Sequence, residues 1–205
     1  MIKFLACGFG RNDEVLNIEL AKKLCESGNK RDIREIVDGM KSKDRAIAND
    51  CIKVLYEIGQ RKPDYIVEFT DGFIDALSSQ NNRMVWGGMT ALTCVTPINP
   101  EAVFNRLPEI LEAYERGSVI TVDNCISVLA CLCKANEEYK KQIFPFLLEH
   151  ISNCRPKEMP QHAERISICI DMGNKAAFMN ALAAREDELT GSQKSRVMKL
   201  IKGLK

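Results

Sequence analysis

The sequence predicts an all-α fold, a right-handed α-solenoid of about five helix pairs that repeat every 37 residues. Apolar residues recur at this step, first as Val15, Ile52, Met89, Ile126 and Ala163 and, three residues later, as Ile18, Leu55, Leu92, Leu129 and Ile166. A spacing of three places each pair on one helical face. Alternating apolar and polar residues, which would indicate strands, are scarce.

A second apolar set follows each first helix and indicates a second helix. It comprises Ile36, Phe73, Ile110 and Leu147, and each member is followed by apolar residues one and four positions later. Prolines keep the same step, because Pro63 and Pro100 lie 37 residues apart, as do Pro108 and Pro145. Proline suits the first turn of a helix. We therefore expect second helices at about 71–79, 108–116 and 145–153, each preceded by a shorter helical turn.

The copies predict one domain over residues 1–205. Its repeats are expected at about 12–41, 45–79, 82–116, 119–153 and 159–189, with a capping helix over 192–204. The fifth copy turns early at Gly173–Asn174, so its connection is shorter than in the fourth. Residues 1–11 fit neither helix nor strand clearly.

Two segments resemble HEAT repeats, the helix-pair repeats of armadillo-type solenoids. Residues 83–117, RMVWGGMTALTCVTPINPEAVFNRLPEILEAYERG, contain Ala91-Leu92 in the first helix and Leu-Pro-x-Ile-Leu at the start of the second. Residues 125–151 match with Phe144-Pro145 in place of Leu-Pro. The resemblance covers about residues 12–190 and implies second helices that line a concave surface. HEAT repeats serve many functions, so the fold alone is weak support for a role.

Composition argues against several classes of function. The 205 residues carry 29 basic and 28 acidic side chains, so net charge does not favour a nucleic-acid binder. No apolar run is long enough to span a membrane, and no secretory segment is expected before the nine cysteines. An odd cysteine count in a chain of this length predicts reduced, mostly buried thiols and a cytoplasmic location.

Candidate metal and catalytic groups are few. His150 and Cys154 lie four residues apart, and His162 is near in sequence, but there is no Cys-x-x-Cys pair. Buried thiols explain the cysteines without a metal. We predict no metal site, no cofactor and no catalytic residue, and therefore no enzyme.

An acidic ladder is the main candidate site. Asp38, Asp75, Glu112 and Glu149 occur at successive steps of 37, each on the face of a second helix opposite its apolar stripe. Only three basic residues stand against nine acidic ones in 63–124. On the concave side of a HEAT-like stack, this would form a groove of one sign of charge that attracts a basic peptide. The alternative is an ordinary solvated helix face.

Trp86 is the other candidate. In the 37-residue register it aligns with Asn49 and Asp123, so a polar, outward side chain is expected there. A large aromatic at such a position is a candidate binding anchor. The alternative is that its ring folds over Gly87 and Gly88 onto the preceding repeat.

These features favour a non-catalytic scaffold or adaptor that binds a protein or peptide partner, with a basic partner the best match. Two alternatives stay open. The first is a HEAT-like nucleic-acid-binding protein or alkylpurine DNA glycosylase, in which the basic residues near both ends of the chain would contact the phosphate backbone. The second is a structural subunit of a larger assembly.

Overall fold

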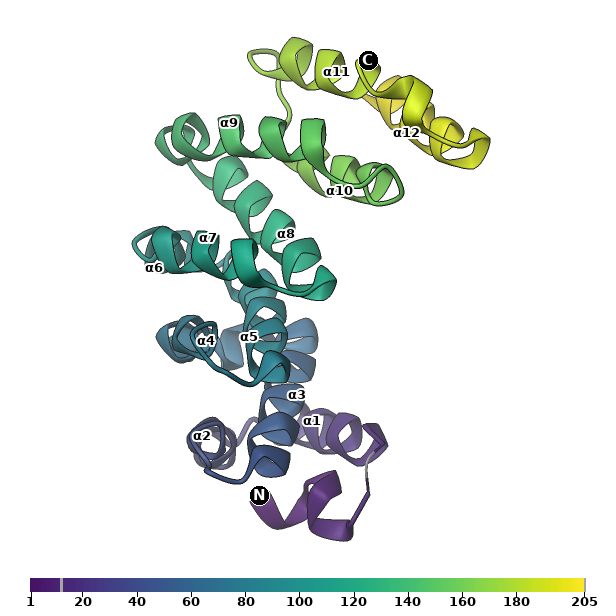
Figure 1. The fold of residues 1–205 in the computed structure, drawn as a ribbon. Helices are drawn as coiled ribbons and strands as arrows, with labels where there is room; N and C mark the ends of the chain where they lie inside the picture. The colour runs from purple at the N-terminus through teal and green to yellow at the C-terminus, as the bar shows by residue number, and fades with distance from the viewer. Residues whose placement is uncertain (12, 205) are drawn as a thin grey trace. The chain divides into compact units, whose positions relative to one another are not determined.

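The computed structural model describes residues 1–11 and 13–204, and over those residues it consists of helices and connecting turns, with no strand (Figure 1). The first helices of the pairs are α1 (Val15–Ser27), α3 (Arg45–Arg61), α5 (Asn82–Val95), α8 (Val119–Ala135) and α10 (Met159–Ile166). The second helices are α2 (Lys30–Gly39), α4 (Thr70–Ala76), α7 (Leu107–Arg116), α9 (Glu137–Asn153) and α11 (Lys175–Ala183). Helices α6 (Pro100–Phe104) and α12 (Gly191–Gly203) complete the set.

The all-α helix-pair prediction is confirmed. Helices α3, α5 and α8 begin at residues 45, 82 and 119, which are successive steps of 37. The residues just before them share a capping role, because Asp44, Asn81 and Ser118 each accept a hydrogen bond from a backbone N–H in the first turn of the helix that follows. Such side chains satisfy N–H groups that have no partner within the helix.

Two second helices differ from the predicted bounds. Helix α4 ends at Ala76, three residues before the expected end. Helix α9 is continuous over 17 residues with Pro145 inside it, so the expected shorter turn before Pro145 is wrong. The proline removes the hydrogen bond to the carbonyl of Lys141. Pro145 and Lys141 are both exposed, so water can serve that carbonyl.

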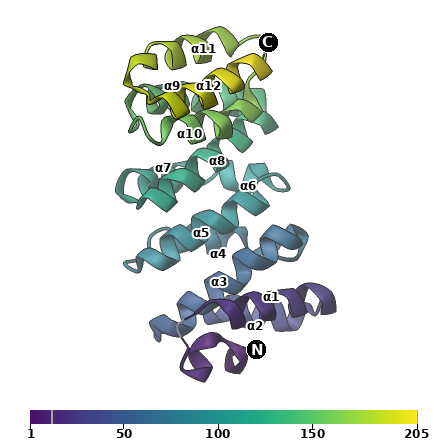
Figure 2. The ribbon, with the colours of Figure 1, turned by 90° about the vertical axis from the view of Figure 1, so that its right-hand side faces the viewer.

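The chain divides into two compact units, residues 1–125 and 126–205, and α8 runs through the boundary. In the N-terminal unit, α1 packs on α3 and α3 on α5, while α2 packs on α3 and α4 on α5 (Figures 1 and 2). In the C-terminal unit, α9 packs against α10 and α11, and α10 contacts α12. No helix of the described residues is long and apolar enough to cross a membrane.

The buried stripes follow the predicted register. Ile52, Leu55 and Ile58 of α3 and Met89, Leu92 and Val95 of α5 are all fully buried. In α1, by contrast, Val15 is 49% exposed, and the described residues before it do not form a helix pair. The N-terminal segment instead forms two 3₁₀ turns, Ile2–Phe4 and Ala6–Phe9. The N–H of Ala6 donates to Asn17 and that of Cys7 to Asp50, which fixes this segment against α1 and α3.

Candidate functional site

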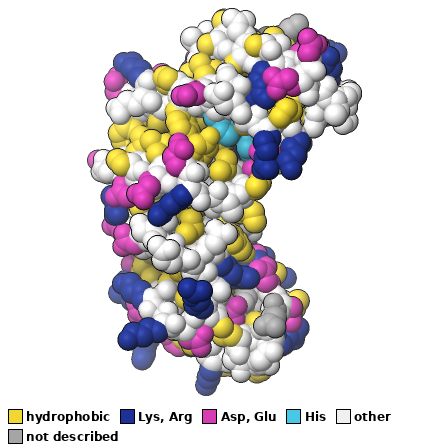
Figure 3. Space-filling model, in the orientation of Figure 1, with side chains coloured by type: hydrophobic (Ala, Val, Ile, Leu, Met, Phe, Trp, Pro, Cys, Tyr) yellow, Lys and Arg dark blue, Asp and Glu magenta, His cyan; other side chains and the backbone are white. Residues whose placement is uncertain are grey.

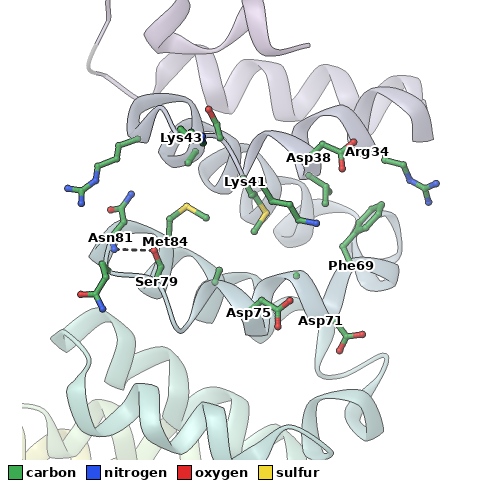
Figure 4. A pocket seen from close by; sticks show the side chains of 18 of the residues that line it. Arg34, Asp38, Lys41, Lys43, Phe69, Asp71, Asp75, Ser79, Asn81 and Met84 are labelled. Atoms are coloured by element: carbon green, nitrogen blue, oxygen red, sulfur yellow. Dashed lines mark hydrogen bonds between the residues drawn. The ribbon is translucent and has the colours of Figure 1, made fainter.

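A cleft of about 820 Å³ lies between α2 and α4 in the N-terminal unit (Figure 4). It forms because α2 and α4 pack on α3 and α5, respectively, and leave a space between themselves. Part of its lining is apolar, from Val37, Met40, Phe69 and Met84. Phe69 carries the guanidinium of Arg34 over its ring, at 5.7 Å from the centroid. The cleft therefore offers both apolar contact and charge.

The two walls of the cleft differ in charge. Arg34, Lys41 and Lys43 come from α2 and the α2–α3 turn, and Arg45 comes from the start of α3. Glu68, Asp71 and Asp75 come from α4 and the turn before it. Arg34 donates to Glu68 at 2.8 Å. Asp38 lies on the α2 side, and Figure 4 shows it facing the same space as Lys41 and Asp75. A ligand here would meet cations on one side and carboxylates on the other.

The ladder residues are exposed, as the sequence predicts for each helix. Asp38, Asp75 and Glu112 lie on α2, α4 and α7 of the N-terminal unit, and Glu149 lies on α9 of the C-terminal unit. The described structure places only the first three in one unit.

Their charge is partly compensated, which corrects the expectation of a groove with one sign of charge. Arg106 lies 3.2 Å from Asp75, 3.7 Å from Asp71 and 2.5 Å from Glu109, and Arg116 lies 3.5 Å from Glu112. The Arg106 guanidinium holds the pKa of Glu109 below its ordinary value. Basic and acidic side chains are interspersed over the N-terminal unit in Figure 3. Counting charges along the sequence missed this, because one arginine can serve three carboxylates.

Trp86 is half-buried on α5 and does not line the cleft. Its ring centroid lies 5.8 Å from that of Tyr56 on α3, and the guanidinium of Arg83 sits over it at 5.6 Å. Its ring thus contacts the preceding helix pair, while part of its surface stays accessible.

A charged cluster around Lys53 of α3 was not foreseen from the sequence. Lys53 is only 5% exposed, and its ammonium lies 2.8 Å from both Glu14 and Glu57. Burial alone would lower the pKa of Lys53, but hydrogen bonds to these carboxylates raise it above its ordinary value. Burial raises the pKa of Glu57, yet Lys53 and Arg61 together bring it below its ordinary value. The signal was present, because Lys53, Glu57 and Arg61 follow one another at steps of four.

The thiols are partly as expected. Cys51, Cys125, Cys133 and Cys169 are buried, and the other five are half-buried. Burial raises the pKa of Cys51 to about 12. However, the structure brings Cys154 together with His150 and His162, three residues from which the sequence predicted no metal site.

No protein-family model matches the chain, and no curated protein matches it. Solved structures do resemble it. A designed armadillo repeat protein in complex with the peptide (KR)4 has a TM-score of 0.67 at 10% identity, covering 91% of this chain and 86% of that one. Two engineered proteins have TM-scores of 0.61 at 16% and 17% identity, covering 93% and 95% of this chain and 89% and 94% of theirs. With the 37-residue helix pairs, these likenesses show that the chain has the fold of an armadillo- and HEAT-type α-solenoid.

Proposed function

We propose that this protein is a non-catalytic scaffold that binds a peptide segment of a partner protein in the cleft between α2 and α4. In this proposal Asp38, Asp71 and Asp75 contact basic side chains of the peptide, and Glu112 continues the contact along α7. Glu149 is a further carboxylate of the same kind on the C-terminal unit. The observation that carries the proposal is the open, partly apolar cleft whose α4 wall is acidic.

The physical argument starts from the shape of the site. Peptide sites combine apolar contact with a few placed polar groups. Asp71 and Asp75 expose 79% and 69% of their side chains, so an incoming cation can reach them. The designed armadillo protein with a similar fold is in complex with a peptide of alternating basic residues, which supports the choice of a basic ligand for this chain.

Arg106 sets the strength of the interaction. Its guanidinium already lies beside Asp71, Asp75 and Glu109, so a peptide arginine must share or replace these contacts. Exposed ion pairs of this kind are worth about 0–1 kcal/mol, so the exchange costs little. Association should therefore be weak to moderate, and it should weaken as salt screens the carboxylates.

The test uses fluorescence anisotropy with a labelled peptide of alternating lysine and arginine. Asp38→Asn, Asp71→Asn and Asp75→Asn are combined in one variant. The matched control combines Glu26→Gln, Asp64→Asn and Glu115→Gln, which makes the same change in net charge at exposed sites that do not line the cleft. We expect the cleft variant to lose at least about tenfold in affinity and the control to stay within about threefold of the wild type.

Equal losses in the two variants would show attraction by net charge alone and would contradict the cleft as the site. A glutamate-rich peptide and a plain DNA duplex complete the panel. Tighter binding of duplex than of basic peptide would favour the nucleic-acid alternative, for which Lys41, Lys43 and Arg45 would be the contacts.

Trp86 is a second proposed contact. Because it does not line the cleft, a partner would have to extend beyond the peptide to reach it. Protection of Trp86 from acrylamide quenching by a bound partner, but not by the short peptide, is the expected result. Loss of the fold when a stoichiometric partner is removed would instead favour a structural subunit. A cytoplasmic location completes the proposal, since reducing conditions suit the free, buried thiols.

A further inference from the structure

Three side chains with metal-binding atoms meet inside the C-terminal unit. His150 lies on α9, Cys154 directly follows α9, and His162 lies on α10. His150 Nε2 and His162 Nδ1 are 2.8 Å apart, and one ligand atom from each of the three residues lies within 4.8 Å of the others. The imidazoles are 5% and 0% exposed, and Cys154 is half-buried. The cluster is therefore part of the packed interior with its thiol near the edge.

The repeat shows that packing does not require these residues. Successive steps of 37 back from His150 reach Ala113, Ala76 and Gly39, and the same steps from His162 reach Cys125, Gly88 and Cys51. Each of the three earlier copies thus has a pair of small residues at these two positions.

These small pairs are in close contact. A Cβ on Gly88 would lie 3.2 Å from Cβ of Ala76, and a Cβ on Gly39 would overlap Sγ of Cys51. At the fourth such contact, two imidazoles take the place of the small pair. Their facing nitrogens hydrogen-bond to each other at 2.8 Å, and a metal ion held by both nitrogens would take the place of that hydrogen bond.

The ligand chemistry points to zinc. Imidazole nitrogen and thiolate sulfur bind Zn²⁺ at about 2.0–2.1 Å and 2.3 Å in a tetrahedral arrangement, which sets the two nitrogens about 3.3 Å apart. The present 2.8 Å separation needs to open by only about 0.5 Å to reach that geometry. Mg²⁺ and Ca²⁺ prefer oxygen ligands, which this trio does not supply.

We propose that His150, Cys154 and His162 bind one Zn²⁺ ion, with a water molecule or an external ligand in the fourth position. Binding requires both facing nitrogens to be unprotonated, so the proton that the two rings share moves to the other nitrogen of one ring. The thiol proton is released to solvent, and the bound form carries a thiolate.

Arg185 supports this arrangement from the next helix pair. It donates to Cys154 Sγ at 3.7 Å and to the carbonyl oxygen of Ile151 at 2.7 Å, and it pairs with Glu188 at 2.6 Å. Burial raises the pKa of Cys154, and Arg185 opposes that rise. Glu188 balances the charge of Arg185, so the guanidinium adds little repulsion toward the metal. Cys154 is only half-buried, so a solvated ion can approach the cluster from the side of its thiol.

The test uses the full chain, reduced with a phosphine and freed of metal. Added Co²⁺ reports tetrahedral geometry through its visible bands and thiolate ligation through near-ultraviolet charge transfer, and Zn²⁺ should displace it. X-ray absorption of the zinc-loaded protein should show one sulfur and two imidazole ligands per ion. We expect one ion per chain. A folded, reduced wild type without the cobalt spectrum, or a zinc shell with two or more sulfurs, would overturn the proposal.

The variants locate the site. His150→Ala restores the residue found at this position in two earlier copies, so the helix should still pack. Cys154→Ser removes the thiolate, and Cys131→Ser is the control, since Cys131 is another half-buried thiol of the same unit. Loss of an outer-sphere partner alone weakens metal binding about 10- to 100-fold, so each ligand variant should lose at least about 100-fold. Zinc affinity that falls as much in Cys131→Ser, or that survives in His150→Ala, would refute the assignment.

Discussion

Replacing Lys53 by methionine tests whether the buried charge cluster of the N-terminal unit is balanced. The ammonium of Lys53 lies 2.8 Å from Glu14 and from Glu57, and the side chains of Lys53 and Glu57 are 7% and 10% exposed. Methionine keeps most of the aliphatic volume but removes the charge. Glu57 then keeps its pair with Arg61, and Glu14 keeps its pair with Arg83.

Removing one partner of a buried pair costs about 3–5 kcal/mol, because the other charge stays buried without compensation. Both carboxylates keep an arginine, so we expect the low end, a loss of about 3 kcal/mol in the free energy of unfolding. The matched control is Lys141→Met, since the Lys141–Glu138 pair is 69% exposed on both sides. It should change stability by at most about 1 kcal/mol.

Urea denaturation measures both variants, followed by far-ultraviolet circular dichroism because Lys141 lies in the other unit, and for Lys53→Met by tryptophan fluorescence as well. Trp86 is the chain's single tryptophan and lies in the same unit as Lys53, so its emission reports the unfolding of that unit. The double variant Lys53→Met/Glu57→Met also removes the Glu57 carboxylate that the single variant leaves without its lysine. It should recover about half or more of the lost free energy of unfolding. A single variant no worse than Lys141→Met, or a double variant worse than the single one, would refute the reasoning.

Three further predictions concern the same unit. Gly88→Ala should lower its stability by about 1–2 kcal/mol, because the new Cβ would lie 2.7 Å from the carbonyl oxygen of Phe73. The control Gly72→Ala places its Cβ where no atom lies within 4 Å, so it should raise stability by about 0.5–1 kcal/mol in the same urea assay. The pKa of Glu57 is lowered in the folded protein, so its ionised carboxylate stabilises the fold above the unfolded-state pKa of about 4.3. This stabilisation is lost as pH falls through the folded-state pKa, so Glu57→Gln should make the free energy of unfolding less dependent on pH in the acid range. Cys51, with its pKa raised to about 12, should resist iodoacetamide at pH 8 in the native protein and react in urea, as peptide mass spectrometry can check; native labelling as fast as unfolded would contradict its burial.

The fold was predictable because one requirement repeats along the chain. Each helix pair must bury its apolar stripe against the next pair, so the 37-residue step of Ile52, Met89 and Ile126 could be read directly. The starts of the first helices were also encoded, in capping residues such as Asp44 and Asn81. The continuity of α9 was missed because Pro145 is tolerated inside this helix, where it is exposed and water can serve the carbonyl that loses its hydrogen bond.

The candidate sites were less predictable, since they depend on distances between segments. The exposure of Asp75 followed from the helical period, but its contact with Arg106 depends on how the chain turns between α6 and α7. Likewise, His162 reaches His150 because residues 154–158 fold α10 back onto α9. No spacing rule in the sequence gives that approach.

The separation of α2 from α4 has a mechanical consequence. In the N-terminal unit, α1, α3 and α5 pack on one another in series, whereas the cleft separates α2 from α4. Tightly packed contacts resist compression far more than solvent-filled space does. Bending that changes the α2–α4 distance should therefore cost less energy than bending that opens the contacts among α1, α3 and α5. The curvature of this unit thus has a soft direction, and a molecule held between α2 and α4 would stiffen it by fixing their separation.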